Sequence, residues 1–236
     1  MFENLANFRD IGGRPVDGGG EVRSGRLFRS DSVAYASAAD ARRLHADLGL
    51  ATVIDLRGER ETARYGRGPL ADLPIGYVHV PITDVGPGGG DLADFYLAVL
   101  DQRGAMLADL LRGLLAPGAL PAVVHCEAGC DRTGVVTAVL LGLLGVPDEV
   151  IIADFDLTRE ALPAMNARWR RFFLADERNL PEDWVEETWG EREAAMVRTA
   201  ARVRQRWGGW EGWASTYGLT APELTALRAL LVTPPP

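Results

Sequence analysis

The chain has 236 residues, 47% of them hydrophobic, which is enough for one large α/β domain or for a domain with an extension. Its net charge of −8 argues against a protein that binds nucleic acid, because such a protein needs a basic face. We expect a soluble, cytoplasmic protein, since no apolar run is long enough to span a membrane and no basic leader precedes the first apolar residues.

Strand and helix patterns alternate along the chain up to about residue 157. In chain order, we predict a strand at 22–29, a helix at 37–48, a strand at 51–56, a helix at 59–65, a strand at 77–80, helices at 91–100 and 105–115, a strand at 121–125, and helices at 135–144 and 147–157. This alternation predicts an α/β fold whose mostly parallel central sheet is flanked by helices. In such a sheet the loops after Leu56, Val80 and His125 meet at one edge, where sites form.

The sequence after residue 162 differs in composition and has a helical pattern throughout. It holds all six tryptophans: Trp169, Trp184, Trp189, Trp207, Trp210 and Trp213. We therefore predict an α/β core at 1–162 and a C-terminal helical part of the same domain at 163–236. Two hypotheses stay open for this part: a packed cap whose aromatic side chains fill the core, or a mobile lid over the active site at about 163–195.

Residues 125–134, His-Cys-Glu-Ala-Gly-Cys-Asp-Arg-Thr-Gly, are the most informative part of the sequence. The run before them is apolar and β-branched, as in a buried strand, and the run after them is apolar and long, as in a buried helix. A tight loop between a strand and a helix converges its backbone amides and the helix N-terminus on one anion. We predict a phosphate-binding loop made of Glu127, Ala128, Gly129, Cys130, Asp131 and Arg132.

The side chains of this loop suit nucleophilic catalysis on phosphorus. A loop of inward amides favours a thiolate, so Cys126 is the predicted nucleophile. Arg132 offers a planar fork of donors to two phosphoryl oxygens, which a lysine could not do. The hydroxyl of Thr133 is placed to stabilise the departing Cys126 sulfur, and His125 is placed to order the loop. The expected reaction passes through a phosphocysteine that water hydrolyses, and it requires no metal ion and no other cofactor.

Four stretches of the chain resemble a known family. They are the Cys-x5-Arg-Thr loop, Asn-Phe-Arg-Asp-Ile-Gly-Gly at 7–13, Val-Ile-Asp-Leu-Arg at 53–57 and Ala-Asp-Phe-Asp-Leu-Thr at 153–158. Together they resemble the bacterial atypical tyrosine phosphatases, which belong to the protein-tyrosine and dual-specificity phosphatase superfamily. The resemblance covers residues 4–231 and implies a phosphotyrosine phosphatase-like fold, with Cys126 as the nucleophile and Arg132 as the residue that holds phosphate.

Two aspartates are candidates for the general acid. The resemblance suggests Asp131, inside the loop; a carboxylate that only orients Arg132 is the alternative role for this residue. Asp84, which follows a predicted strand and precedes a glycine-rich stretch, is the other candidate. The acid must lie within hydrogen-bond reach of the leaving oxygen, so geometry decides between them.

Charged residues at the ends of other predicted strands are expected to support the site. For Asp55 we favour a structural role, whereas both a salt bridge and a contact behind the site fit Arg57. Arg9 and Asp10 are expected to form a buried ion pair that ties down the N-terminus. Cys130 is either a small filler or a partner that resolves an oxidised Cys126 by forming a disulfide.

The leading hypothesis is a cysteine-dependent phosphomonoesterase that acts on phosphotyrosine in proteins, with phosphoserine and phosphothreonine as further substrates. A phosphoinositide phosphatase that uses Asp131 as its acid is the alternative, and it is weakened because Cys130 stands where family members often carry a lysine linked to lipid phosphate. A non-catalytic phosphate-binding protein is the remote alternative, which the intact Cys126 and Arg132 argue against. The expected partner is thus a phosphorylated protein or a phosphoinositide, and export without a leader stays open beside cytoplasmic residence.

Overall fold

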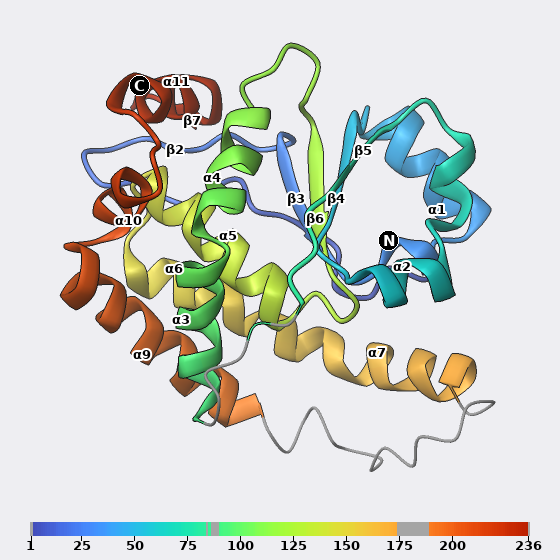
Figure 1. Ribbon diagram of the computed structural model, residues 1–236. Coiled ribbons are helices and arrows are strands. Elements are labelled where there is room, and N and C mark those ends of the chain that lie inside the picture. Colours follow the sequence, from blue (N-terminus) through green and yellow to red (C-terminus); the bar gives the residue numbers. More distant parts are fainter. Residues whose placement is uncertain (1, 84, 86–89, 174–188, 236) are drawn as a thin grey trace.

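A computed structural model of the chain describes residues 2–83, 85, 90–173 and 189–235, and for residues 169–173 it describes only the backbone. A five-stranded sheet with the order β1-β3-β6-β4-β5 forms the centre (Figure 1). The strands are β1 (Arg9–Asp10), β3 (Leu27–Ser30), β4 (Thr52–Asp55), β5 (Gly76–His79) and β6 (Ala122–His125). β1 pairs antiparallel with β3 and the other pairs are parallel, so the predicted mostly parallel sheet is confirmed.

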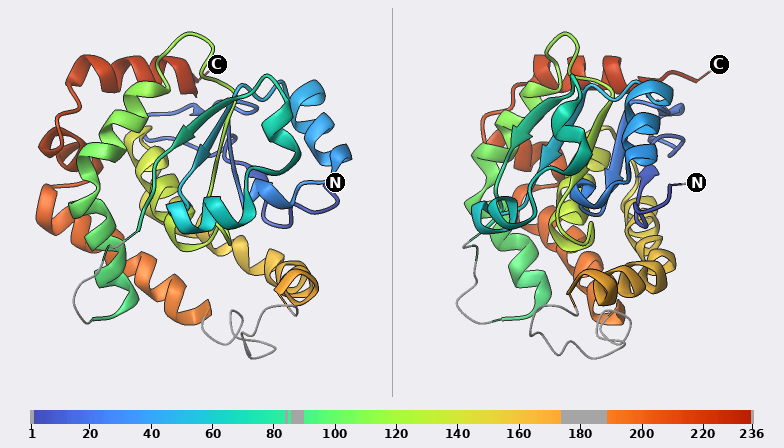
Figure 2. Two further views of the ribbon diagram at one scale, coloured as in Figure 1. Left: turned by 45° about the vertical axis from the view of Figure 1, so that its right-hand side comes forward. Right: turned by 90° about the vertical axis from the view of Figure 1, so that its right-hand side faces the viewer.

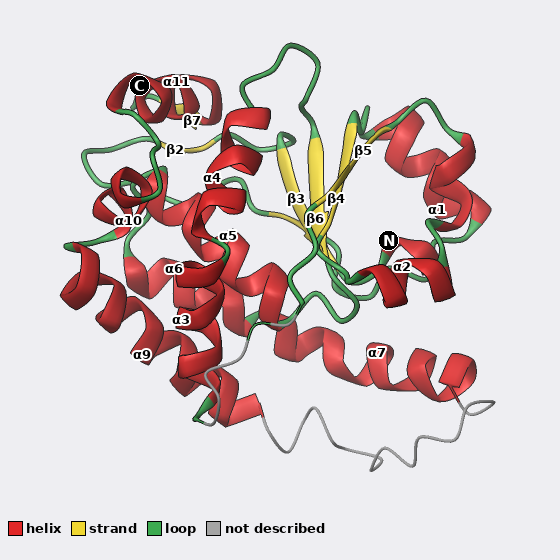
Figure 3. Ribbon diagram, in the orientation of Figure 1, coloured by secondary structure: helices red, strands yellow, loops and turns green. Residues whose placement is uncertain are grey.

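Helices lie on both sides of this sheet (Figures 1 and 3). On one side are η1 (Val33–Tyr35), α1 (Ala38–Arg42), η2 (Arg43–Asp47), α2 (Glu59–Tyr65) and η3 (Gly68–Asp72). On the other side are α3 (Leu92–Gln102), α4 (Gly104–Gly113), α5 (Asp131–Leu143), α6 (Asp148–Asp156), α9 (Trp189–Trp207), α10 (Trp210–Thr216) and α11 (Ala221–Leu231). The helix α7 (Thr158–Phe173) runs past the carboxyl ends of the strands, as two further views show (Figure 2). None of the helices within the described ranges is both long enough and apolar enough to cross a membrane.

Each face of the sheet has its own hydrophobic core, because successive residues of a strand point to opposite faces. Val53 and Val123 belong to a cluster that includes Leu44 of η2. Their neighbours Ile54 and Val124 belong to a larger cluster that includes side chains of α3 to α7 and of α9 to α11. The central strands are therefore buried on both faces, which explains their continuous apolar sequences.

The predicted strand at 22–29 is wrong as a single element. Glu21–Val22 form β2, which pairs antiparallel with β7 (Val232–Thr233) in a separate two-stranded sheet. A turn separates β2 from β3: Gly25 has a φ of 71°, and its amide donates to Asp10 Oδ2 at 2.6 Å. A left-handed residue cannot continue a strand, so two strands form where the apolar pattern suggested one.

The predicted helices are present, and several have different ends. α2 has the predicted bounds. The helix predicted at 37–48 begins after Ser37, whose hydroxyl accepts from the Asp40 amide at 3.1 Å. α5 begins four residues earlier than predicted, at Asp131, because Gly134 N already donates to Cys130 O at 2.8 Å. The last residues of the predicted phosphate loop are therefore the first turn of α5.

The C-terminal part packs on the α/β core and is not wholly helical, since β7 is a strand. Trp189, Trp210 and Trp213 are buried in the same hydrophobic cluster as α5. The predicted boundary after residue 162 falls inside α7. Trp184, the Trp169 side chain and residues 174–188 of the hypothetical lid lie outside the described residues, so the division into two parts and the lid stay predictions.

The contact between α10 and α5 provides a test of this packing. A Cβ atom on Gly142 of α5 would lie 2.2 Å from Trp210 Cδ1, whereas one on Gly113 of α4 would meet nothing within 4 Å. We expect Gly142→Ala to lower the free energy of unfolding by about 1–3 kcal/mol through overpacking. Gly113→Ala, the matched control, should raise it by up to about 1 kcal/mol. Urea unfolding measures both, and equal stabilities of the two variants would contradict the packing.

Candidate active site

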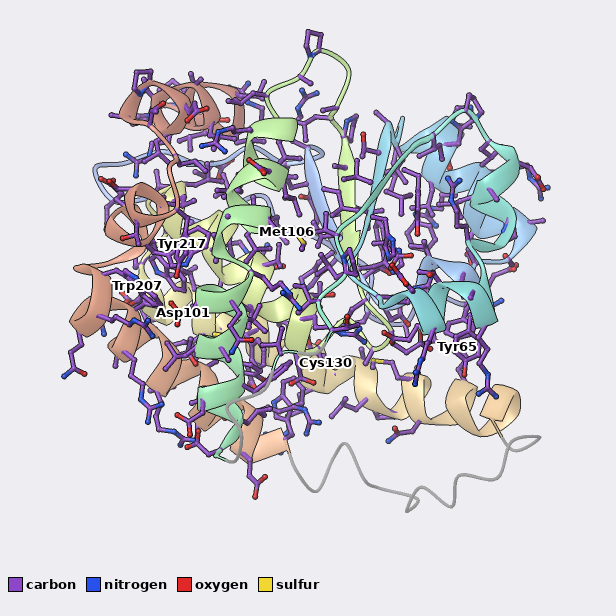
Figure 4. All side chains as sticks on the ribbon, in the orientation of Figure 1. Tyr65, Asp101, Met106, Cys130, Trp207 and Tyr217 are labelled. Atoms are coloured by element: carbon purple, nitrogen blue, oxygen red, sulfur yellow. The ribbon has the colours of Figure 1, made fainter. Side chains whose placement is uncertain are left out.

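The predicted phosphate loop leaves the carboxyl end of β6, in the middle of the sheet. His125, the last residue of β6, is in register with Ser30 at the end of β3 and with Asp55 at the end of β4. The carboxyl ends of three parallel strands therefore surround the loop, where sites of α/β sheets form. In Figure 4, Cys130 lies at the start of α5, above α7.

The loop folds back over the Cys126 sulfur. Cys126 is 2% exposed, and the amide of Gly129 donates to its Sγ at 3.2 Å. The turn requires glycine at 129, where φ is +69° and a Cβ atom would lie 2.4 Å from the carbonyl oxygen of Ser30. A backbone amide aimed at sulfur stabilises negative charge there, as a nucleophilic thiolate requires.

Arg132 is held by Glu61 of α2, a residue that the sequence analysis missed. Arg132 Nη1 and Nη2 donate to Glu61 Oε2 and Oε1 at 2.6 and 2.8 Å, a bidentate pair. Burial disfavours the charge on Arg132, but Glu61 and the nearby Cys126 outweigh burial and raise the pKa of the guanidinium. Burial likewise disfavours the Glu61 carboxylate, yet the bonds from Arg132 lower the pKa of Glu61. Glu61 also accepts from the Gly58 amide at 2.8 Å, and this helix-capping spacing is the sequence signal that could have identified it.

Asp131, the first residue of α5, faces α3 and α9. Its Oδ1 accepts a hydrogen bond from the Tyr96 hydroxyl at 2.6 Å and lies 3.4 Å from Nε of Arg192. Burial and the neighbouring Asp131 raise the pKa of Tyr96, so the phenol remains a donor. Neither Tyr96 nor Arg192 stands near the loop in sequence, so no local pattern marks them. The rival candidate acid, Asp84, lies outside the described residues.

His125 and Thr133 are fully buried at the two ends of the loop. Nδ1 of His125 lies 3.0 Å from the carbonyl oxygen of Cys126, so this nitrogen carries the proton and donates to the start of the loop. Burial lowers the pKa of His125, although Asp55 Oδ2 lies 3.6 Å from Nε2, so the ring is neutral near pH 7. The Thr133 hydroxyl forms no hydrogen bond with any described residue, so the bond expected to the Cys126 sulfur is not made in this structure.

Asp55 and Arg57 form a fully buried ion pair behind the loop. Arg57 Nη2 and Nε donate to the Asp55 carboxylate at 2.7 and 3.0 Å. Arg57 Nη1 donates to Ser32 Oγ at 3.1 Å and lies 3.9 Å from Glu127 Oε2. Burial disfavours the Asp55 carboxylate, but the hydrogen bonds and the charge of Arg57 outweigh burial and lower the pKa of Asp55. The pair thus connects the end of β4 to the loop.

The remaining loop side chains carry no positive charge. Glu127 accepts a hydrogen bond from the Tyr35 hydroxyl, and burial raises the pKa of its carboxyl group. Cys130 Sγ lies 3.6 Å from the Ala128 carbonyl oxygen, and burial raises the pKa of this thiol well above its usual value. The thiolate is the attacking form in thiol exchange, and burial disfavours it at Cys130; the choice between the filler role and the disulfide role stays a prediction. Within the described residues, no three His, Cys, Asp or Glu side chains are grouped to hold a metal ion.

The predicted ion pair between Arg9 and Asp10 is wrong. Arg9 Nε lies 3.5 Å from Asp154 Oδ1 of α6, while Asp10 accepts from the amides of Gly12 and Gly25. Adjacent strand residues point to opposite faces, so the two side chains have different surroundings. The N-terminal motif is therefore tied to α6.

Known proteins with similar sequences are phosphatases by name. The sequence model of the tyrosine phosphatase family matches residues 1–233. A protein of Cupriavidus necator, provisionally named a tyrosine-protein phosphatase, is 34% identical over 168 residues, which are 65% of this chain and 60% of that protein. The triple specificity protein phosphatase PtpB of Mycobacterium tuberculosis is 30% identical over 198 residues, which are 69% of this chain and 70% of PtpB. The match thus spans less than two thirds of the Cupriavidus protein.

Solved structures give weaker similarities. The core catalytic domain of the PP-IP phosphatase SIW14 from S. cerevisiae has a TM-score of 0.42 and 17% identity, covering 87% of this chain and 98% of that one. TpbA from P. aeruginosa has a TM-score of 0.37 and 20% identity, covering 61% of this chain and 81% of that one.

The Asp55–Arg57 pair makes stability depend on pH. Because folding lowers the pKa of Asp55, the pair stabilises the fold above the unfolded-state pKa of about 3.9, and this stability is lost as the pH falls through the folded-state pKa. We expect Asp55→Asn to lower the free energy of unfolding by about 3–5 kcal/mol near pH 7. The difference from wild type should shrink at about pH 3, because below an unfolded-state pKa of about 3.9 the unfolded wild-type chain takes up a proton at Asp55 more readily than the folded chain does.

Urea unfolding at both pH values measures this difference. Asp109→Asn is the control, because the Asp109 side chain is 76% exposed and its loss should change stability by less than about 0.5 kcal/mol. A deficit of Asp55→Asn that is the same at both pH values would contradict the ion-pair explanation.

Proposed function

The chain belongs to the tyrosine phosphatase family, and on this premise we propose that it hydrolyses phosphate monoesters through a phosphocysteine intermediate. The Cys126 sulfur attacks phosphorus in line with the leaving oxygen, so an S–P bond forms and the P–O bond breaks. Water then attacks phosphorus, the S–P bond breaks and inorganic phosphate leaves. The observation that carries this proposal is the Gly129 amide aimed at the buried Cys126 sulfur, with Arg132 fixed nearby by Glu61.

We propose that the reaction is accelerated by charged and polar groups that are already oriented toward the phosphoryl group. Backbone amides of the loop and the Arg132 guanidinium would face the phosphoryl oxygens, where negative charge develops in the transition state. Glu61 fixes the plane of that guanidinium through both terminal nitrogens. The buried Thr133 hydroxyl, which makes no other hydrogen bond to the described residues, would donate to the Cys126 sulfur as it leaves.

Asp131 is the proposed general acid. The Tyr96 hydroxyl holds the carboxyl group by Oδ1, so Oδ2 is the atom proposed to give a proton to the leaving oxygen. In the second step the same carboxylate would take a proton from the attacking water. Tyr96 and Arg192 are then residues that orient the acid from α3 and α9.

Charge favours a substrate with a single phosphate. The arginines that reach loop residues each face a carboxylate, in the pairs Arg132–Glu61, Arg57–Asp55, Arg192–Asp131 and Arg29–Asp154. The loop side chains at 127 and 130 add a glutamate and an uncharged cysteine. The loop amides and Arg132 would bind one phosphate group. A second phosphate group, as in a polyphosphoinositide, would find no further cationic side chain on the loop and would be repelled by Glu127.

Aromatic side chains beside the loop favour an aryl phosphate. Tyr35, which donates to Glu127, and Tyr65 of α2 have ring centroids 6.2 Å apart. Tyr35 is buried and has the Arg168 guanidinium 4.7 Å from its ring centroid, so the partly exposed Tyr65 ring is the one that a substrate ring would contact, by its edge or in an offset stack. We therefore infer that phosphotyrosine in proteins is the preferred substrate, and that phosphoserine and phosphothreonine, which have no ring, react more slowly.

The mechanism is tested with phenyl phosphate and p-nitrophenyl phosphate in EDTA. Cys126→Ser should abolish turnover. Asp131→Asn should lower kcat about 10²–10⁴-fold for phenyl phosphate, whose leaving oxygen needs a proton, and less for p-nitrophenyl phosphate. Asp84→Asn is the rival variant, and a selective loss there with Asp131→Asn unaffected would transfer the acid role to Asp84. A wild-type protein without turnover would support the phosphate-binding hypothesis instead.

The substrate class is tested by comparing a phosphotyrosine peptide with phosphatidylinositol mono- and trisphosphate in detergent micelles. PtpB has triple specificity in its name, so phosphoserine and phosphothreonine peptides belong in the same panel. We expect kcat/KM to be highest for the phosphotyrosine peptide, by at least about tenfold, and Glu127→Gln to raise it for the trisphosphate alone. A wild-type preference for the trisphosphate would assign the lipid function.

A further inference from the structure

We propose that Asn7 and Arg29 are positioning residues of the phosphate loop: they bind the loop carbonyls from outside and thereby aim the loop amides at the substrate. This inference rests on the proposed function, because it assigns a role in that reaction to residues that touch neither the nucleophile nor the phosphate. It joins the N-terminal motif and β3 to a loop that lies about 100 residues later in the sequence.

The physical basis is the planar trans peptide. In such a peptide the C=O of one residue and the N–H of the next point in opposite directions. A carbonyl that is held on the outside of the loop therefore turns the following amide to the inside. The direction of the phosphate-binding amides is set by whatever binds the carbonyls.

The carbonyls from 126 to 129 are all bound by groups outside the ring of amides. His125 Nδ1 donates to Cys126 O at 3.0 Å, and Ser32 N donates to Glu127 O at 3.0 Å. Asn7 Nδ2 donates to both Ala128 O and Gly129 O, at 3.1 Å each. Arg29 Nη2 also donates to Gly129 O, at 2.9 Å. Asn7 thus binds two of these four carbonyls, that of Ala128 together with the longer contact from Cys130 Sγ at 3.6 Å and that of Gly129 together with Arg29. The consequence is visible at the peptide after Ala128, where the amide of Gly129 points inward and donates to Cys126 Sγ at 3.2 Å.

Asn7 is itself fixed in one orientation. It is 2% exposed, and its backbone amide donates to Asp31 Oδ1 at 3.3 Å. Its side-chain oxygen accepts from Arg9 Nη1 at 2.5 Å, so the amide nitrogen is the end that faces the loop. Arg9 is in turn held by the Asp154 carbonyl at 2.8 Å and the Thr158 hydroxyl at 3.0 Å.

Arg29 adds charge as well as a hydrogen bond. It is 1% exposed, with Nη1 on Asp154 Oδ2 at 2.9 Å and Nη2 on the Gly129 carbonyl. Arg9 and Arg14 also pair with Asp154, so positive charge is in excess behind the loop. A guanidinium on a carbonyl polarises the peptide and makes its N–H, here that of Cys130, a stronger donor to an anion.

Oxyanion binding separates this role from a merely structural one. Loss of an ordinary structural contact lowers the melting temperature and leaves the affinity of the folded protein for an anion unchanged. Loss of a residue that aims the amides weakens the binding of inorganic tungstate, which occupies a phosphate site, and lowers kcat in parallel. Both quantities are measured on protein that circular dichroism shows to be folded.

The test uses the full chain as wild type, Asn7→Ala, Arg29→Lys and the control Asn4→Ala. Asn4 has the same residue type in the same segment, and its backbone carries its hydrogen bonds to Asp40 and Arg168. We expect Asn7→Ala to lower the affinity for tungstate, measured by calorimetry, about 10- to 100-fold. The kcat for p-nitrophenyl phosphate should fall by a similar factor. Asn4→Ala should change neither by more than about twofold.

Arg29→Lys keeps a positive charge beside Asp154, but an ammonium group cannot bind Asp154 and the Gly129 carbonyl together with the fixed geometry of a guanidinium. This variant should therefore also bind tungstate more weakly. If Asn7→Ala does not fold, Asn7→Asp replaces it; this variant has the same shape and presents an acceptor to two carbonyls, so its tungstate affinity should fall further. Folded Asn7 variants that bind tungstate like Asn4→Ala would overturn the inference. Wild-type protein that binds tungstate without turning over substrate would refute the proposed function alone.

Discussion

A loop that turns its amides inward must turn its carbonyls outward, and every buried carbonyl needs a donor. This constraint explains why segments far apart in the chain meet behind residues 126–130. Asn7 comes from the turn before β1, Arg29 from β3 and Ser32 from the segment after β3. The segment from Asn7 to Ser32 therefore helps to hold the phosphate loop in shape, through its donors to the loop carbonyls.

Arginine meets this demand better than lysine, and the chain has no lysine. A guanidinium presents several donors in one plane, so a single side chain can bind a carboxylate and a backbone carbonyl at fixed angles. Arg29 binds Asp154 and the Gly129 carbonyl in this way, and Arg57 binds Asp55 and the Gly66 carbonyl. Each of these two arginines has a carboxylate beside it in a buried region, where an unpaired ion would be costly.

The sequence predicted the parts of this protein that local patterns encode. The sheet, the loop and most helices follow from apolar periodicity and from glycine, because these signals act within a few residues. The contacts of Glu61 and Tyr96 with the loop, and the role of Asn7 in the motif at 7–13, were not predicted, since they come from partners on other elements. The same reason explains two errors: Arg9 finds Asp154 instead of its neighbour Asp10, and the apolar run at 22–29 divides between two sheets at a left-handed glycine.

The pair between Arg132 and Glu61 has a consequence for recognition. A long side chain that is free in the empty site loses rotamer entropy when it captures a ligand, at a cost of about 0.5–1.5 kcal/mol. Here the guanidinium is already immobilised by two hydrogen bonds before any ligand arrives. Binding of an oxyanion would therefore change the conformational freedom of the Arg132 side chain very little. The affinity would then depend on how well the phosphate ester fits the site, because little entropy would be lost in fixing Arg132.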